Sequence, residues 1–296
     1  MITSISVSNF RGIKDTMELT IPQSGGPVVD SGITANRTSF VSAVTGTVAH
    51  LARPHAETDQ MPYIPYLPDR IDDPTEVVFR MVSDPDGKVK EYRISFDDEG
   101  IRGESLRIGR RRVFDRVEGK GVRKDILKYT TAKSAYLTVS AHLNDSECNA
   151  VLKEIKNIRT CSMFGDGKPY ITVDDFEDRA ETVPTMEGWL RSLGVVKVKW
   201  GLYEDRRRYP ELGASRKYII RLEHEAFEYD WSEECGLVRR LFPVMAPMAK
   251  TAMDGGILLV DDFGVGLDDD SVSMVKSMFS EAAVEGARMV TFGGRK

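Results

Sequence analysis

Positions 257–260 are four consecutive apolar residues, which follow a glycine pair and lead directly into Asp261 and Asp262. An apolar run without polar alternation is typical of a central parallel strand that is buried on both faces. Carboxylates at the end of such a strand lie at the sheet edge where open α/β proteins bind ligands. The pattern therefore predicts a ligand site at this edge, or else only a buried strand that enters an acidic turn.

The amino-terminal part of the chain mixes apolar and polar residues in a way that predicts strands before the first helix. We expect a strand over residues 2–10, its hairpin partner over 17–21 and a short strand over 27–30. Apolar residues at helical spacing predict a helix over 38–52, whereas residues 53–75, with five prolines and little periodicity, predict a surface loop. A loop that begins at residue 31 joins the short strand to the helix.

The middle of the chain alternates more regularly, with acidic turns between the runs, and predicts an antiparallel module. Pro243 and Pro247 should kink or divide the helix in which they fall. Predicted strands cover residues 76–82, 91–96, 104–108, 134–141, 197–203, 217–223 and 287–292, and predicted helices cover 145–158, 187–193, 233–253 and 271–285. We therefore predict a mixed α/β fold, in which the first and last thirds form one sheet flanked by helices and an antiparallel β module is inserted between them.

Composition excludes several classes of protein. The 296 residues, 41% hydrophobic and 29% charged, suit a soluble globular protein, and a net charge of −5 gives no general attraction to nucleic acid. Three cysteines without CxxC spacing fit a reducing compartment, and four scattered histidines offer no zinc site. No apolar run reaches membrane-spanning length, so we expect a cytoplasmic protein.

Residues 31–39 lie between a predicted strand and a predicted helix, which is the context of a phosphate-binding loop. Against the pattern G-x-x-x-x-G-K-[ST], a register that starts at Gly32 matches the first Gly and ends on Ser39. In this register Arg37 replaces the second Gly and Thr38 replaces the Lys. Because Arg tolerates positive φ poorly and Thr carries no charge, both replacements weaken a phosphate cradle.

A second register starts at Ser31 and matches only Thr38, with Asn36 for the second Gly and Arg37 for the Lys. We prefer the Gly32 register because it keeps two of the motif residues. The simplest alternative is an ordinary helix start, in which Asn36 or Thr38 is the N-cap.

The pattern I-x-V-x-N-F-R-G over residues 5–12, then the loop, then the late acidic strand resembles the ABC-type ATPase heads of the SMC, RecF and OLD group. It is most similar to the ABC-like ATPases, also called AAA ATPases, of bacterial abortive-infection and anti-phage systems. The resemblance covers most of the chain, through the order and spacing of elements more than through strict motif identity. It implies a P-loop NTPase fold with a single domain over residues 1–296, in which 1–56 and 217–296 form the nucleotide-binding core and 76–216 the inserted module.

The resemblance also implies roles for individual residues. ATP would lie against the loop, with Mg²⁺ held by Ser39 and Asp261 and with the attacking water polarised by Asp262. Ser232 and Gly236 take the place of the signature motif, which contacts the partner's nucleotide in a head-to-head dimer; a plain N-cap at Ser232 is the alternative. The implied cofactor-binding residues are Gly32, Asn36, Arg37, Thr38, Ser39, Ser232 and Gly236.

The chain departs from this family in several respects. In the preferred register the phosphate loop lacks the second Gly and the Lys, and the acidic strand ends in Asp-Asp where Asp-Glu is usual. The last strand delivers no His to the γ-phosphate, and no convincing Gln can be assigned to the Q-loop. We therefore expect a head that binds ATP and Mg²⁺ weakly, as assembly ligands, and that hydrolyses ATP slowly or not at all.

Two groups of basic residues are candidate contacts to nucleic-acid phosphates or to an acidic partner protein. The alternative is that they are solvated hairpin tips, whose charge is balanced by nearby acids. The first group is Arg107, Arg110, Arg111, Arg112 and Arg116 with Lys120, Arg123 and Lys124, and the second is Arg206, Arg207 and Arg208.

Three functions follow from the resemblance and from the departures. The first is an ABC-type ATPase-like subunit of an anti-phage defence or related DNA-transaction complex, which works as a dimer or larger assembly with a separate effector such as a nuclease. The second is a scaffold that keeps the fold and binds no nucleotide, and the third is an active DNA-repair ATPase with an unusual loop. Purified protein would separate them by binding without turnover, by no binding, or by turnover that collapses in Asp261→Ala.

Overall fold

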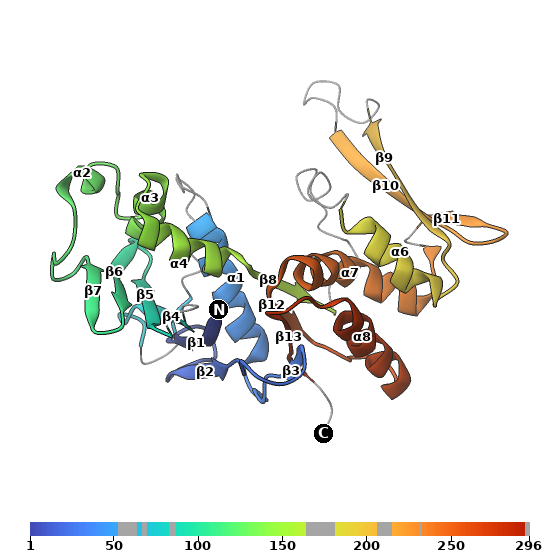
Figure 1. Ribbon diagram of the computed structural model, residues 1–296, viewed down its shortest axis with the longest axis horizontal. Coiled ribbons are helices and arrows are strands. Elements are labelled where there is room, and N and C mark those ends of the chain that lie inside the picture. Colours follow the sequence, from blue (N-terminus) through green and yellow to red (C-terminus); the bar gives the residue numbers. More distant parts are fainter. Residues whose placement is uncertain are drawn as a thin grey trace.

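The computed structural model describes residues 1–52, 64–66, 70–82, 87–163, 181–205, 215–230 and 233–293. These residues form an antiparallel sheet, a parallel sheet and a smaller three-stranded sheet. Helix α1, Arg37–Ala52, lies where the first two sheets meet and contacts strands of both (Figure 1). The chain therefore has the expected mixed α/β fold, with helices on its sheets.

The antiparallel sheet has six strands in the order β2-β1-β4-β5-β6-β7. Ile5, Phe79, Tyr92 and Leu106 stand opposite one another on four neighbouring strands, and all are fully buried. The predicted alternation of this module is thus confirmed, since one face of the sheet forms a core. The strands are β1 Ile2–Ser8, β2 Met17–Thr20, β4 Thr75–Val82, β5 Val89–Phe96, β6 Ile101–Ile108 and β7 Arg111–Asp115.

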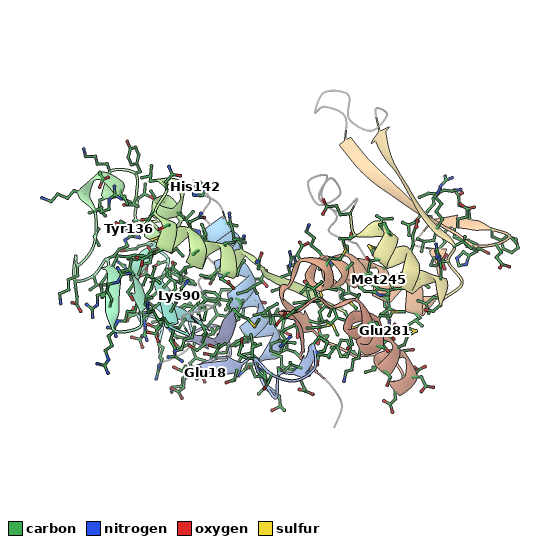
Figure 2. The ribbon with its side chains drawn as sticks, viewed as in Figure 1. Glu18, Lys90, Tyr136, His142, Met245 and Glu281 are labelled. Carbon is green, nitrogen blue, oxygen red and sulfur yellow. The ribbon has the colours of Figure 1, made fainter. Side chains whose placement is uncertain are left out.

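Three helices pack on the buried face of this sheet: α1, α3 (Tyr136–His142) and α4 (Ser146–Lys156). Figure 2 labels Tyr136 and His142 at the two ends of α3. Asp145 caps α4, because its Oδ1 accepts the backbone N–H groups of Glu147 at 3.1 Å and Cys148 at 3.0 Å. The short helix α2, Lys124–Leu127, connects the sheet to α3.

A buried carboxylate fixes the start of α3. The side chain of Glu104, on β6, is fully buried and accepts the backbone N–H groups of Tyr136 and Leu137, both at 2.7 Å. It also accepts the hydroxyl of Tyr92 at 3.0 Å and the guanidinium of Arg116 at 3.1 Å. Because the first N–H groups of a helix have no partner within it, the sheet here supplies the missing acceptor.

The parallel sheet has the order β3-β13-β12-β8, with β3 Val28–Asp30, β8 Ile158–Ser162, β12 Gly256–Asp261 and β13 Ala287–Thr291. Successive residues of β12 enter two different cores. Ile257 and Leu259 pack with the α1 side, whereas Leu258 and Val260 pack with the opposite side. Burial on both faces explains why this strand has no polar alternation, as the sequence predicted.

Helices α7 (Gly236–Asp254) and α8 (Asp269–Ala282) pack on the second face of the parallel sheet. Beyond α7 lie α6 (Val183–Arg191) and the three-stranded sheet β11-β10-β9 (Figure 1). The strands predicted over 197–203 and 217–223 are confirmed: β9, Lys197–Asp205, pairs antiparallel with β10, Ser215–Glu223, and β11, Glu228–Asp230, lies on the outer side of β10.

Several predicted elements are corrected. Residues 134–141, predicted as a strand, mostly belong to helix α3, and α7 is one helix that continues through both prolines. The first and last thirds do not form one sheet, because β1 and β2 pair with the antiparallel strands and only β3 joins β13. Strand β8 was not predicted. The division into a core over 1–56 and 217–296 and an inserted module over 76–216 stays a prediction.

Candidate functional site

The carboxyl ends of the four parallel strands meet at one edge of their sheet. Backbone bonds join them there: the N–H of Ser31 donates to Thr291 O at 3.0 Å, and the N–H of Phe263 donates to Phe292 O at 2.9 Å. The loop after β3 and the acid pair after β12 therefore flank the end of β13. This confirms the expected convergence of two segments that lie far apart in the sequence.

The loop after β3 is shaped by short side chains. Asp30 Oδ1 accepts the N–H of Gly32 at 3.0 Å, and Ser31 Oγ accepts the N–H of Ile33 at 3.3 Å. Asn36 has a left-handed backbone, with φ of 54°, and its carbonyl accepts the N–H of Phe40 at 3.0 Å as α1 begins. The loop thus ends on a left-handed residue immediately before a helix.

The start of α1 offers donors to an anion. The backbone N–H groups of Arg37, Thr38 and Ser39 lie in the first turn, where no intrahelical acceptor exists. Among the hydrogen bonds of the described residues, none gives these three groups another acceptor. Unpaired N–H groups at the positive end of a helix are the usual contacts of a phosphate.

Arg37 lies between the loop and the acid pair. A Cβ built on Gly293, just after β13, would lie 2.7 Å from Arg37 Nη1 and 3.5 Å from the backbone N of Phe263. The guanidinium therefore occupies the space that a side chain at position 293 would fill. Its positive charge also acts on Asp262, where it opposes the rise in pKa that burial and the charge of Asp261 cause.

The two acids differ in exposure and role. Asp261 is 3% exposed and accepts the N–H of Asp262 on Oδ1 at 2.9 Å, so one carboxylate oxygen is already used. Asp262 is half-buried with φ of 52°, and the Ser162 hydroxyl donates to its Oδ2 at 3.4 Å. Burial raises the pKa of Asp262 above its usual value and the charge of Asp261 raises it further, against the effects of Arg37 and Ser162.

To hold Mg²⁺, this sheet edge would need phosphate oxygens of a bound nucleotide in addition to protein groups. Among the described residues, no group of three or more His, Cys, Asp or Glu side chains could hold a metal ion. Mg²⁺ usually takes one or two carboxylates and completes its shell with phosphate oxygens and water. Asp261, with one oxygen left, and a hydroxyl of the first turn of α1 fit that smaller donor set.

The structure adds site residues that the sequence did not indicate. Gly293 makes room for Arg37, and Ser162, at the end of β8, contacts Asp262. The Gly293-Gly294 pair after the last strand could have indicated that another group packs closely against the backbone there, but the sequence does not show that this group is Arg37. Nothing in the sequence marked Ser162, because the strand that carries it was not predicted.

The predicted signature region is described only in part. Ser232 lies outside the described residues, and Gly236 is the first residue of α7. Just before the helix, Glu234 is buried and its Oε1 lies 2.6 Å from His224 Nε2. Further along α7, Arg240 Nη1 donates to the carbonyls of Gly266 at 2.6 Å and Val265 at 3.3 Å, so the helix holds the turn that follows the acid pair.

Most of the first basic group is paired with acids. Arg111 pairs with Glu147, Arg112 with Asp115 and Glu118, Arg116 with Glu104, Lys120 with Glu118 and Arg123 with Asp125. These pairs favour the interpretation of hairpin tips whose charge is balanced nearby. The second group, at positions 206–208, lies outside the described residues. Within the described part of the chain, every helix is too short or too polar to cross a membrane.

Neither a protein-family model nor a curated protein matches the chain. Solved structures that align with it include the Smc head bound to the C-winged helix domain of ScpA, which is 17% identical with a TM-score of 0.49 over 100% of this chain and 90% of that one. The SMC head domain from Thermotoga maritima is 10% identical, with a TM-score of 0.44 over 99% and 89%. The Smc head domain with an extended coiled coil, bound to the C-terminal domain of ScpA derived from Pyrococcus furiosus, is 13% identical, with a TM-score of 0.48 over 99% and 89%. At these identities and TM-scores the alignments assign no function.

Proposed function

We propose that this chain is an ABC-type ATPase-like subunit that binds a nucleoside triphosphate at the edge of its parallel sheet. The observation that carries the proposal is the position of Arg37: it heads a helix with three unpaired N–H groups and lies beside the acid turn of a neighbouring strand. A positively charged side chain and the N–H groups of a helix start bind a polyphosphate, and carboxylates help to bind its Mg²⁺. All three kinds of group lie around this sheet edge.

The backbone supports the register that starts at Ser31. In the phosphate-loop pattern the second Gly precedes the Lys directly, and Gly is the residue that adopts positive φ without strain. Asn36 has that left-handed backbone and stands just before Arg37, the first residue of α1. In the Gly32 register Arg37 itself would replace the Gly, although it is already helical. We therefore assign Asn36 to the place of the second Gly, Arg37 to that of the Lys and Thr38 to that of the hydroxyl residue.

The same residues support weak hydrolysis. Asp262 stands where a catalytic carboxylate is expected, but its side chain is short and its backbone is left-handed. The positive charge of Arg37 also acts on its carboxylate. A guanidinium is bulkier than an ammonium and less suited to the narrow place between two phosphates. ATP with Mg²⁺ would then act mainly by stabilising an assembled state.

The assembly that we propose is a head-to-head dimer or larger homo-oligomer, in which Ser232 and Gly236 of one copy contact the nucleotide of another. The proposed biological role, anti-phage defence in the cytoplasm with a separate effector, is supported by the family resemblance alone. Contact with nucleic acid through residues 107–116 or 206–208 stays a prediction.

Titration of purified protein with a fluorescent ATP analogue, with and without Mg²⁺, tests the nucleotide site. We expect weak saturable binding, and tighter binding by about tenfold, or about 1.4 kcal/mol, when Asn36→Gly and Arg37→Lys together restore the loop. The matched control is Arg37→Gly with Thr38→Lys, which restores the other register and should bind no better than wild type.

Each outcome discriminates between the functions. Binding without turnover supports the assembly-ligand role, whereas turnover that collapses in Asp261→Ala would identify an active ATPase. Absence of binding in wild type and in both restored loops would leave only the scaffold function and overturn this proposal.

A further inference from the structure

A pocket of about 790 Å³ lies where the ends of β4, β5, β6 and β7 meet α4. Its volume is within the range of small-molecule sites, which combine an apolar lining with a few polar groups. None of its described lining residues belongs to the edge of the parallel sheet, so it is a separate candidate site. The apolar part of its lining includes Met81, Val82, Ile108 and Ala150.

One row of residues across the antiparallel sheet forms part of the pocket wall. The row consists of Met81, Lys90, Ile108 and Arg111, which pair in register across the four strands. Alternate residues of a strand share a face, so Lys90 lies on the same face of β5 as the fully buried Tyr92. Lys90, labelled in Figure 2, is therefore a cation that the sheet places on its core face and that lines the pocket.

Lys90 has no counter-ion among the described residues. It is half-buried, and neither an acid nor a hydrogen-bond acceptor in that part of the chain pairs with its ammonium group. A partly buried charge without a partner costs stability, and a methionine beside Met81 and Ile108 would avoid that cost. Proteins retain such costly groups mainly where function needs them.

Arg110 is the second cation of the pocket. It follows Gly109, which has φ of 57° and whose N–H donates to Val89 O at 2.7 Å, so the turn between β6 and β7 is fixed to the start of β5. Arg110 is exposed and likewise has no side-chain partner among the residues that the structure describes. The turn therefore keeps this guanidinium at the pocket that Lys90 also lines.

The acids of the pocket are already paired. Glu147 pairs with Arg111, and a carboxylate oxygen of Glu154 lies 3.5 Å from the amino group of Met1. Among the described residues, four cationic and two acidic side chains line the pocket, which leaves an excess of two positive charges. An anion with two negative charges would balance them.

We propose that this pocket, independently of the nucleotide site above, binds a phosphate monoester, whose phosphate lies between Lys90 and Arg110 and whose organic part lies on the apolar lining. A phosphate monoester carries nearly two negative charges at neutral pH, whereas a carboxylate carries one. Arg binds phosphate through its planar fork, and Lys binds it as a point charge. The monoester belongs either to a free nucleotide or to the 5′ end of a nucleic-acid strand.

An NMR titration of isotope-labelled protein with adenosine 5′-monophosphate tests this pocket. The amide signals of Gly109 and Ala150 report its occupancy, and that of Thr38 reports occupancy of the edge of the parallel sheet. We expect saturable shifts at Gly109 and Ala150 with the monophosphate and none with adenosine. Lys90→Met and Arg110→Gln should each raise the dissociation constant about fivefold or more, because each removes a charge-assisted contact. Lys90→Met should also melt at the wild-type temperature or higher.

The matched control is Lys128→Gln, which removes an exposed cation just after α2, outside the pocket, and should leave the affinity unchanged. An equal loss of affinity in this variant would mean general attraction to surface charge and would overturn the proposal. Shifts at Thr38 alone, or equal shifts with adenosine, would also overturn it.

Two oligonucleotides, one phosphorylated at its 5′ end and one not, separate the sources of the monoester. A larger shift of the Gly109 signal with the phosphorylated strand supports the proposal and identifies a strand end as the source. A response to the monophosphate alone supports it with a free nucleotide as the source. Equal responses to the two strands would show that phosphodiesters are sufficient and would overturn the assignment of a monoester.

Discussion

The side-chain amide of Asn36 donates to the backbone carbonyl of Gly12 at 2.8 Å. A Cβ added to Gly12 would collide with Oδ1 of the same Asn36, so the two residues can meet only because position 12 has no side chain. The contact joins the turn after β1 to the last residue of the candidate phosphate loop. It explains why a glycine in the amino-terminal pattern matters to a loop that follows it by 24 residues.

Gly12→Ala should therefore weaken nucleotide binding, because the added methyl group collides with the Asn36 side chain and can shift the loop that carries it. Asn36→Gly removes that side chain and causes no such collision. We expect a loss of about 0.5–1.5 kcal/mol in the free energy of unfolding, since the exposed Asn36 side chain must move and give up its hydrogen bond to Gly12. The dissociation constant for the fluorescent ATP analogue should rise in parallel. Gly26→Ala is the control, because an added Cβ there meets nothing within 4 Å. Unchanged affinity in a folded Gly12→Ala protein would show that the collision with Asn36 does not shift the phosphate loop.

The strands of the parallel sheet show what the sequence could and could not predict. Strand β12 was predictable because Ile257 to Val260 are apolar and buried on both faces. Strand β8 was not, because Arg159, Thr160 and Ser162 look like a loop. As the edge strand of its sheet, β8 can carry polar residues that a central strand could not.

Helix α3 shows a second limit. Aromatic and β-branched residues at 136–139 have the local preference of a strand, but all are buried in a core that also contains Ile155 of α4. Glu104, more than 30 residues earlier, accepts the first two N–H groups of this helix, and no local pattern reveals such a partner. The Arg37–Gly293 contact was hidden for the same reason: each residue is ordinary alone, and only the parallel sheet brings them together.

Glu104→Gln should be among the most destabilising single changes in the antiparallel part. Each carboxylate oxygen accepts one helix N–H group and one side-chain donor, so either orientation of an amide places an NH₂ group against an N–H donor. Breaking a buried pair of this kind costs about 3–5 kcal/mol. Glu118→Gln, which removes a fully exposed acid paired with Lys120 and Arg112, should leave the free energy of unfolding nearly unchanged. Equal urea midpoints for the two variants would contradict the assigned role of Glu104.

Tyr92 should make the protein less stable at alkaline pH. Burial and the neighbouring Glu104 raise the pKa of Tyr92 well above its usual value. Below that usual value both folded and unfolded chains keep the phenol proton; above it only the unfolded chain releases the proton, so the free energy of unfolding falls as pH rises. Tyr92→Phe loses a hydrogen bond worth about 1 kcal/mol at neutral pH but is free of this alkaline loss. Urea unfolding between about pH 8 and pH 10.5 should show that the difference in free energy of unfolding between wild type and Tyr92→Phe becomes smaller as pH rises. A difference that stays constant over this range would contradict the prediction.

Arg240 should control the mobility of the turn after the acid pair. Its guanidinium binds the carbonyls of Val265 and Gly266, while the N–H groups of Val265 and Leu267 are bonded inside the turn at 3.1 Å each and so report on its opening. Arg240→Met keeps most of the apolar stem of the side chain and removes the Nη1 group that donates to both carbonyls. Because a hydrogen bond from a charged group contributes about 1.5–3 kcal/mol, amide exchange at Val265 and Leu267 should be about tenfold faster or more.

The neighbouring exposed Arg239 supplies the control for that measurement, since Arg239→Met removes a charge from the same helix without touching the bonds to the turn. If both variants exchange at the wild-type rate, the turn is held by its own backbone bonds and α7 does not support it. If only Arg240→Met exchanges faster, the helix that begins at Gly236 is mechanically joined to the residues that follow Asp262. A structural change at the start of α7, such as one caused by contact with a second copy of the chain, would then be transmitted through Arg240 to the turn that follows the acid pair.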